Sequence, residues 1–577
     1  MTDAPNQPAP RWRTWLPPVL IVFVALGYYG SYLQFWFNPH DEGGTAAFMA
    51  MRLLAGEVPL RDVELGYNVL WFWPIVGLFK VAGVNFLLMR GYFFALSIIT
   101  ALCGWALVRR VTRNEWLALA AGLALVVFPG SQFKNYNALL CVANTLCLVQ
   151  AALVAGHPAP FFWRRVAVGG LVLGLTFLVR IDIGFLVAPL WAGLLFLRLF
   201  QCGLTPRARW IDSATAGAIL LAGIIVTHAP VLAVARTQGF ERAFLRQYPA
   251  WLEEIGERAG LIASAPPPRA AAGVPKKKLR PKTLAPVSRA TLPRMDWETF
   301  ASFKDTDKSV LFLLTYWPIA VYLPLIGWAG VSVFGALRRR DFALDQPAAL
   351  ALLLLGGSLT TFAQFFFFRP DRPHLSEFMP GYFVATVCVA MLLARKPARF
   401  LLGAVLALQF ALFGYVALDH YSAGTIAART RIKPNKRVLF EGANGVRVWV
   451  HKKDHAQLEG VRRAVVEHAK PGEWVVCYPY QPGFNLMTDR PTYERALYMD
   501  NAIATRDWPR KAIARMEENR PAVIVIDERA INRGEFSRFS RWAMPVYEWV
   551  RANYHHSGTF GEVEVYARDP LPETTNL

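Results

Sequence analysis

Acidic residues are scarce in this chain, and the common motifs for metal and nucleotide chemistry are missing. The 577 residues hold 41 Asp or Glu against 62 Lys or Arg. The six cysteines form no C-x-x-C pair, and the ten histidines show no H-E-x-x-H spacing. The C-terminal part carries neither G-x-G-x-x-G nor a P-loop, so nothing there marks a nucleotide site. The sequence therefore requires no cofactor; a divalent metal stays possible, although no motif in the sequence supports one.

Long hydrophobic runs exclude a soluble globular protein. Hydrophobic residues make up 54% of the chain, 39 residues are Phe, and the mean hydropathy is +0.29. Many apolar runs of roughly 15 to 25 residues are long enough to cross a hydrocarbon core about 30 Å thick. The chain is therefore predicted to be a polytopic membrane protein. The first run, 15–37, has no small-residue cleavage site and is predicted to be a retained helix.

The net charge of +21 invites a nucleic-acid partner, but its distribution argues against one. Basic residues lie in short clusters between the apolar runs, as the positive-inside rule expects of cytoplasmic loops. Alternate clusters then place the N-terminus inside and the first loop outside. The clusters assigned to the cytoplasmic side are Arg11 and Arg13, Arg109 to Arg113, Arg164–Arg165, Arg207 and Arg209, Arg338–Arg340, and Arg395 to Arg399.

This alternation predicts eleven transmembrane helices. The run 69–82 has about fourteen residues, too few to cross comfortably, and is predicted to lie against the outer surface. The C-terminal region then lies outside. The predicted crossings are 15–37, 86–108, 115–129, 136–155, 166–179, 183–200, 213–236, 309–336, 347–368, 377–394 and 400–418.

Residues 1–419 are predicted to form the transmembrane domain, and a second external loop, 237–308, interrupts its helices. The part at 240–258 has the pattern of an amphipathic surface helix. The part at 265–294 carries seven prolines, eight Lys or Arg and no acid, a composition that cannot bury a core. This basic segment either touches anionic lipid headgroups or is a solvated linker.

Residues 420–577 contain no further membrane-length run. Short β-rich runs at 446–450, 474–478 and 523–526 alternate with helical patterns near 455–469 and 507–519. This alternation predicts a small extracytoplasmic α/β domain with a partly parallel sheet.

The first external loop, 38–85, gathers four carboxylates at a membrane surface. Asp41 and Glu42 follow the first apolar run, and Asp62 and Glu64 follow about twenty residues later. A carboxylate near a bilayer is unfavourable in free energy unless it is solvated, paired with a cation or used in binding or catalysis. This loop is therefore a candidate functional site. The alternative is that Asp41 and Glu42 only cap a helix that begins at Thr45.

Basic side chains gather at the predicted outer ends of the helices. Arginine suits phosphate because its planar guanidinium donates paired, charge-assisted hydrogen bonds. The sequence therefore predicts a pocket for a phosphate-bearing lipid headgroup at this face. The alternative is that each arginine anchors at the interface or pairs locally, for instance Arg180 with Asp182. The candidate phosphate ligands are Arg90, Arg180, Arg369, Arg372 and His374, and Asn137 lies at the same predicted face.

The order of these elements resembles the C-type glycosyltransferase superfamily, and in particular bacterial relatives of protein O-mannosyltransferases and lipid A aminoarabinose transferases. The resemblance rests on His40-Asp41-Glu42-Gly43, the segment 56–62, the short run ending at Gly83, and Arg90. It implies an enzyme of the bacterial inner membrane that uses a polyprenyl-phosphate sugar donor. It also implies that the sugar is transferred on the outer face, with inversion of its anomeric configuration. The chain departs from the aminoarabinose transferases where Tyr67-Asn68-Val69 replaces their Lys-Pro.

The resemblance also implies roles for the acidic loop. Asp41 corresponds to the loop aspartate essential for catalysis, with Glu42 beside it and Asp62 as a second acid. An inverting transfer needs a carboxylate opposite the leaving phosphate to accept or orient the proton of the acceptor hydroxyl. Glu64, Tyr67 and Asn137 are the candidate contacts to acceptor or sugar.

Two other classes stay open. A secondary transporter would also have eleven or twelve spans, but the charges cluster at helix ends and no repeat relates the halves. A ligase of lipid-linked glycans would share the donor chemistry without needing an α/β domain.

Overall fold

The computed structural model describes residues 12–31, 33–127, 138–155, 159–202, 205–258, 306–368, 372–393, 396–419, 434–479, 481–499, 504–530 and 535–569. The chain divides into two compact units. The first unit comprises Met1–Leu33, Tyr92–Val234 and Leu292–Arg429, and the second comprises Gln34–Gly91, Ala235–Thr291 and Thr430–Leu577. Each unit is described separately.

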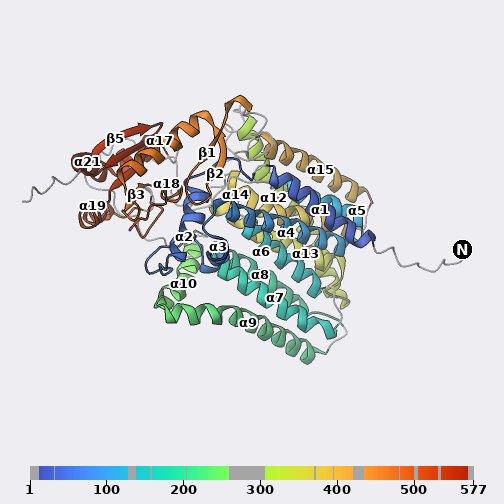
Figure 1. Cartoon of the computed structure of the whole chain (residues 1–577). Coiled ribbons are helices and arrows are strands. Elements are labelled where there is room, and N and C mark those ends of the chain that lie inside the picture. The colour runs from blue at the N-terminus through green and yellow to red at the C-terminus, as the bar shows by residue number, and fades with distance from the viewer. Residues whose placement is uncertain are drawn as a thin grey trace, which may run out of the picture. The chain divides into compact units, whose positions relative to one another are not determined.

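The first unit is helical (Figure 1). A helix lies at the place of every predicted crossing, although α1 ends at Gly30 and the predicted run continued to residue 37. The helices are α1 (Trp12–Gly30), α4 (Phe86–Thr112), α5 (Glu115–Val127), α6 (Ala138–Ala155), α7 (Ala159–Val179), α8 (Ile181–Arg198), α9 (Pro206–Thr237), α12 (Thr306–Arg339), α13 (Pro347–Phe368), α14 (Arg372–Leu392) and α15 (Lys396–Asp419).

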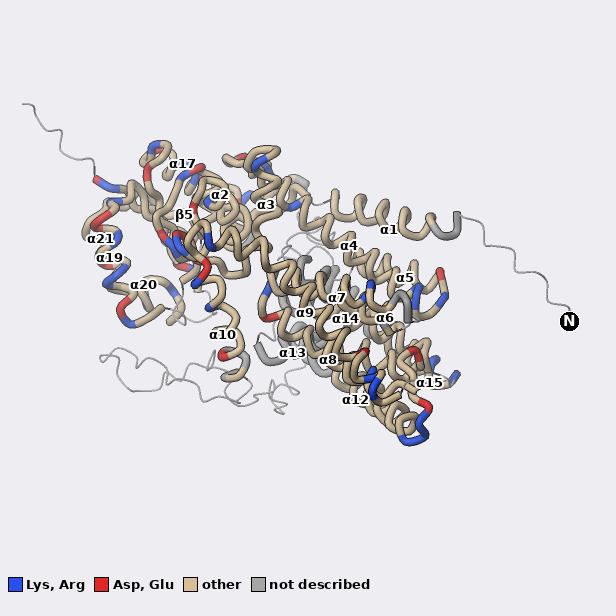
Figure 2. The backbone as a smooth tube through the Cα atoms, turned by 90° about the horizontal axis from the view of Figure 1, so that it is seen from below, with Lys and Arg blue, Asp and Glu red and all other residues tan. Residues whose placement is uncertain are grey.

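Several of these helices are suited to a bilayer. Among the described residues, five stretches are long and apolar enough to cross a membrane: Phe86–Thr112, Phe162–Val179, Ile181–Arg198, Pro206–Thr237 and Trp317–Arg339. Figure 2 shows the helices of this unit mostly without charge along their middle parts. The protein is a multi-pass membrane protein, and the total of eleven crossings stays a prediction.

Close packing in the first unit depends on small residues. Helix α13 packs against α14, α12, α8 and α6, while α7 packs against α6 and α8. At the crossing of α7 with α9, a Cβ added to Gly170 would lie 2.5 Å from the carbonyl oxygen of Leu220, and one added to Gly223 would lie 2.7 Å from the carbonyl carbon of Gly170. Glycine at both positions lets the two backbones approach closely, as is common between membrane helices.

The second unit contains two sheets. Strands β1 (Arg437–Glu441) and β2 (Arg447–His451) form an antiparallel pair. The larger sheet has the order β3-β4-β6-β5, in which β3 (Val475–Tyr478) and β4 (Val523–Asp527) run parallel while β6 (Val563–Ala567) is antiparallel to both β4 and β5 (His555–Phe560). All five side chains of β4 are buried, which explains its uninterrupted apolar run.

The helices of the second unit come from three parts of the sequence. The core beside the larger sheet includes Ile524, Ile526, Met516, Phe539 and Val546. The helices are η1 (Asp41–Phe48), α2 (Met49–Leu54), α3 (Val69–Ala82), α10 (Glu241–Arg258), η3 (Pro434–Lys436), α17 (Lys452–His468), α18 (Gly483–Thr488), α19 (Trp508–Asn519), η4 (Glu535–Ser537), α20 (Phe539–Trp542) and α21 (Met544–Asn553). Helix α10 lies where the amphipathic helix was expected; the basic segment 265–294 falls outside the described residues.

The chain that follows α1 joins this second unit as extended backbone. The amide of Trp36 donates a 3.0 Å hydrogen bond to the carbonyl of Trp449, and the amide of Trp449 donates one of 2.6 Å to Gln34. This pairing beside β2 explains why the first apolar run stops being helical before residue 37. The second unit groups residues 34–91 with the C-terminal region. The division of the chain into domains at residue 420 stays a prediction.

Candidate functional site

The acidic pair of the first loop opens a short π-helix, η1, which begins at Asp41 with His40 as its N-cap. The amide of Gly43 donates to the carbonyl of Asn38 at 3.0 Å, and the amide of Thr45 donates to that of His40 at 3.2 Å. The helix thus begins at Asp41, four residues before Thr45. The alternative in which Asp41 and Glu42 cap a helix that begins at Thr45 therefore places the start of the helix wrongly. The backbones of Asp41 and Glu42 lie in its first turn, and their side chains fall outside the described part. Single π-turns occur frequently at functional sites.

The backbone of η1 is held tightly by the segment that leads into α18. A Cβ at Gly44 would lie 2.6 Å from Cγ of Pro482, and a Cβ at Gly483 would overlap Pro39. The amide of Gly483 donates a 2.7 Å hydrogen bond to the carbonyl of Pro39. Glycine at 44 and 483 therefore permits a contact that a side chain would block. The C-terminal part of the chain positions the turn that carries the acidic pair.

A buried arginine fixes the part of the loop after η1. Arg52 is 5% exposed, and its Nε donates to both carboxylate oxygens of Glu57 at 2.9 Å. Its Nη1 donates to the main-chain carbonyl of Glu494 at 2.7 Å. The carboxylate of Glu494 accepts hydrogen bonds from Tyr478 at 2.7 Å and Arg515 at 2.9 Å. The loop is thus tied to a buried polar network of the C-terminal region.

Asp62 closes a tight turn and is paired with its neighbour. Its Oδ2 accepts from the amide of Val58 at 2.9 Å, and Nε and Nη2 of Arg61 donate to its two oxygens, both at 2.9 Å. The hydrogen bonds from Arg61 are the largest cause that lowers the pKa of Asp62 to about 2, against the opposing effect of desolvation. A carboxylate with so low a pKa is a weak proton acceptor near neutral pH. Its geometry fits a structural clamp better than a catalytic base.

The two other sequence candidates in this loop make local contacts. The amide of Glu64 donates to the carbonyl of Arg495 at 2.9 Å, and Nε of Arg495 lies 3.7 Å from Oε1 of Glu64. The ring of Tyr67 stacks on Trp71 with centroids 5.1 Å apart. Both residues therefore lie in the same loop as Asp62 and belong to the unit that holds η1.

Arg90 is buried and holds main-chain carbonyls. It is 2% exposed, and its Nη1 and Nη2 donate to the carbonyls of Phe35 and Trp36 at 2.8 and 2.9 Å. Its guanidinium carbon lies 4.6 Å from the ring centroid of Phe86. In this arrangement Arg90 fixes the chain that enters the acidic loop.

Arg180 belongs to the first unit and is the N-cap residue of α8. Its Nε donates to Oδ1 of Asp182 at 3.0 Å, and its Nη2 contacts Oδ2 of the same carboxylate. The side chains are 11% and 4% exposed. This bidentate ion pair matches the alternative to phosphate binding, in which Arg180 pairs locally with Asp182.

The remaining candidates lie outside the described side chains. Arg372 begins α14, although its side chain is not described, and this holds also for His374. Arg369 and Asn137 fall outside the described residues altogether. Within the described ranges, no group of three or more His, Cys, Asp or Glu residues is arranged to hold a metal ion.

The structure adds residues that the sequence analysis missed. Gln481, 2% exposed, donates to Oδ2 of Asp527 at 2.6 Å, and Arg529 pairs with the same carboxylate at 2.8 Å. Gln481 follows β3, Asp527 is the last residue of β4, and Arg529 follows β4, so all three lie at the carboxyl ends of two parallel strands. Gln481 directly precedes the segment that contacts η1. Their position in the sequence could have indicated them, because polar residues at the carboxyl ends of parallel strands often form binding sites.

Comparison with solved structures shows that the chain has the fold of the C-type glycosyltransferases. The crystal structure of ArnT from Cupriavidus metallidurans bound to undecaprenyl phosphate matches with a TM-score of 0.50 and 14% identity, covering 96% of this chain and 98% of that chain. The apo state of the same protein gives 0.49, with the same identity and coverage.

The archaeal oligosaccharyltransferase AglB from Archaeoglobus fulgidus, in complex with an inhibitory peptide and a dolichol-phosphate, matches with a TM-score of 0.47 and 11% identity, over 98% of this chain and 75% of that chain. No protein-family model and no curated protein matches the sequence. The similarity to ArnT is therefore a similarity of fold along nearly the whole chain.

Proposed function

We propose that this protein transfers a sugar, with inversion, from a polyprenyl-phosphate-linked donor to a lipid, glycan or protein acceptor on the outer face of the cytoplasmic membrane. The observation that carries the proposal is the fold similarity to ArnT bound to undecaprenyl phosphate, which spans 96% of the chain. The absence of a nucleotide-binding motif agrees with a lipid-linked donor.

In this proposal Asp41 is the base that accepts or orients the proton of the acceptor hydroxyl. Two observations support the choice. Asp41 begins a π-helix, and the chain on either side of it is held by the contacts of Pro39 with Gly483 and of Gly44 with Pro482. Asp62, the other acid of the loop, is committed to Arg61 and has a lowered pKa. Glu42 then orients its neighbour or the acceptor, and Glu64 and Tyr67 line the acceptor side.

The leaving phosphate needs positive charge as its own negative charge develops. Arg90 and Arg180 are both engaged in structural hydrogen bonds, so they are weaker candidates than their positions in the sequence indicate. Arg372 is better placed, because it begins α14 and a helix N-terminus presents main-chain amides to an anion. Arg369 and His374 flank it in the sequence.

The decisive experiment is sugar transfer by purified protein in nanodiscs, with a panel of polyprenyl-phosphate sugars as donors. Asp41→Asn keeps the size of the side chain and loses the proton acceptor, so turnover should fall about 10²- to 10⁴-fold. Asp62→Asn is the matched control and should retain most of the activity. Equal activity of the Asp41→Asn variant and the wild type would overturn the assignment of the base.

The outer-face location has its own test. A phosphatase that is active only after export, fused after Asp419, should be active if the C-terminal region lies outside. Activity of a cytoplasmic reporter alone at the same position would place the acidic loop, which packs in the same unit, on the wrong side for this reaction.

A further inference from the structure

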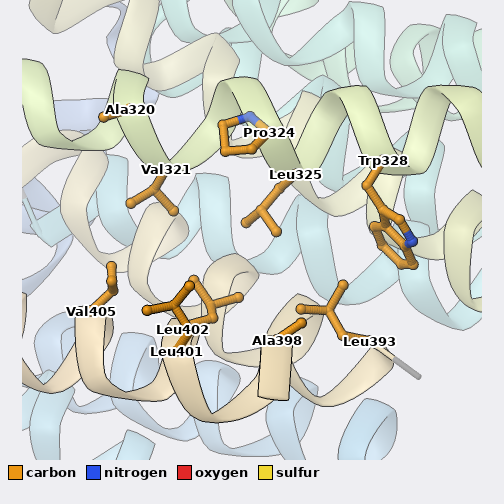
Figure 3. Close-up of a pocket in the computed structure, with 10 residues that line it drawn as sticks. All are labelled: Ala320, Val321, Pro324, Leu325, Trp328, Leu393, Ala398, Leu401, Leu402 and Val405. Carbon is orange, nitrogen blue, oxygen red and sulfur yellow. The ribbon is translucent and has the colours of Figure 1, made fainter. Parts of the chain in front are cut away.

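A second candidate site lies among the helices of the first unit, as an apolar cavity of about 640 Å³ between α12 and α15. Figure 3 shows side chains of both helices pointing into it. A cavity of this volume is large enough for a small ligand or part of a lipid. Its lining includes Ala320, Pro324 and Trp328 from α12 and Ala398, Leu401 and Val405 from α15.

The chemistry of the lining selects a hydrocarbon occupant. Every lining residue is apolar or aromatic, so water would find almost no polar partner there. Leu401 lines the cavity and is 68% exposed, so the cavity opens at the surface of the unit. Phe400 and Phe334 are also large, exposed and apolar on these helices. Because Trp317–Arg339 is long and apolar enough to cross a membrane, we expect this surface to face lipid chains.

One end of the cavity carries positive charge. Helix α15 begins at Lys396, next to the lining residue Ala398, and both Lys396 and Arg399 are exposed. The Nε of Arg399 donates to the carbonyl of Leu393, which itself lines the cavity, so this guanidinium lies at its end. Helix α12 runs on past Trp328 toward Arg338 and Arg339. The opposite end, at Ala320 and Val405, has no charged lining residue.

We propose that this cavity binds one anionic phospholipid, with an acyl chain against α12 and α15 and the headgroup phosphate at Lys396 and Arg399. Basic residues near a membrane surface attract anionic headgroups, and arginine binds phosphate through paired hydrogen bonds. The basic end belongs to a cluster assigned to the cytoplasmic side. The site is therefore distinct from the donor site proposed for the outer face.

The test uses the purified full-length protein and native mass spectrometry after exchange with phosphatidylglycerol or phosphatidylcholine of equal chain length. One phosphatidylglycerol should be retained in preference to phosphatidylcholine. Lys396→Gln/Arg399→Gln should lower that preference about tenfold or more, since each basic residue near the surface contributes roughly fivefold. Arg110→Gln/Arg113→Gln changes another exposed basic cluster and should leave the preference unchanged.

Filling the cavity separates the acyl-chain contact from the charge. Ala398→Trp should abolish retention of the lipid, whereas Ala407→Trp, exposed on α15 and absent from the lining, should not. Ala320→Phe fills the cavity from α12 and replaces Ala398→Trp if that variant unfolds. Equal retention of the two lipids, or retention unchanged by filling the cavity, would overturn the proposal. Displacement of the bound lipid by polyprenyl phosphate alone would instead assign the cavity to the donor chain.

Discussion

Arg52 donates a 2.7 Å hydrogen bond from its guanidinium to the main-chain carbonyl of Glu494, which lies 442 residues further along the chain. The same guanidinium pairs with Glu57 at 2.6 Å. One buried side chain thus holds the acidic loop in its own conformation and also against the C-terminal region. Hydrogen bonds of a charged group of this kind contribute to the stability of the second unit.

Replacing the buried Arg52 should destabilise the second unit more than replacing the exposed Arg495. Arg52→Met loses hydrogen bonds of a charged group and leaves the Glu494 carbonyl without this donor, at a cost of about 1.5–3 kcal/mol. Arg495→Met is the control, because Arg495 ties the same regions through the carbonyl of Leu60 but is 54% exposed. Its loss should cost about 1 kcal/mol or less. Thermal unfolding in detergent measures both, and equal shifts would refute the central role of Arg52.

Gly483→Ala should impair sugar transfer although residue 483 carries no reacting group. The new methyl group would overlap Pro39 and displace the backbone that precedes Asp41. A displacement of about 1 Å in a catalytic group can cost about 10²-fold in rate. Gly66→Ala is the matched control, because a Cβ there meets nothing within 4 Å. The assay is kcat with a polyprenyl-phosphate sugar, and a Gly483→Ala enzyme as fast as Gly66→Ala would mean that the contact does not position Asp41.

Asp62 should stabilise the loop throughout the neutral range and cease to do so only in acid. Its pKa is lowered to about 2, below the value near 3.9 of an unfolded chain. The folded state therefore binds the proton more weakly, so the contribution is complete above about pH 4 and is lost as the pH falls toward 2. The difference in melting temperature between wild type and Asp62→Asn should be constant from pH 5 to 8 and shrink below pH 4. A difference that changes between pH 6 and 8 would contradict the lowered pKa.

The helices of the first unit and three of the strands in the described part of the C-terminal region were predictable from local patterns, whereas β1, β5 and β6 were not expected. Apolar runs of membrane length became helices, and the β-branched runs at 474–478 and 523–526 became β3 and β4 within one residue. The end of α1 was not predictable in this way. Phe35 and Trp36 are apolar enough to continue a helix, yet the segment that holds them pairs with Trp449 as extended backbone.

The sequence predicts a candidate acidic loop, but it does not predict the contacts that the structure shows there. The acidic pair and its loop follow from charge placed at the end of an apolar run. The role of Arg90 could not be predicted in this way, because a guanidinium binds a phosphate and main-chain carbonyls equally well. Only the fold brings the carbonyls of Phe35 and Trp36 within 2.9 Å of the Arg90 guanidinium. The contact of Gly483 with Pro39 was equally hidden, since no sequence pattern relates positions so far apart.

Arg180 offers a direct test of pairing against phosphate binding. Arg180→Ala leaves the carboxylate of Asp182, 4% exposed, without the guanidinium in a low-dielectric environment, and the loss should cost about 3–5 kcal/mol. Removing the charge as well, in Arg180→Ala/Asp182→Asn, should recover most of that stability. Arg339→Ala breaks an exposed pair with Asp341 and should cost about 1 kcal/mol or less.

The stability-restored double variant then separates the two roles of Arg180. If the arginine only neutralises Asp182, the double variant should transfer sugar with the wild-type KM for the donor, because nothing that touches the phosphate has been lost. If the arginine also contacts the phosphate, the donor KM should rise while the thermal stability stays near that of the wild type. A double variant no more stable than Arg180→Ala would show that the cost does not come from the buried carboxylate.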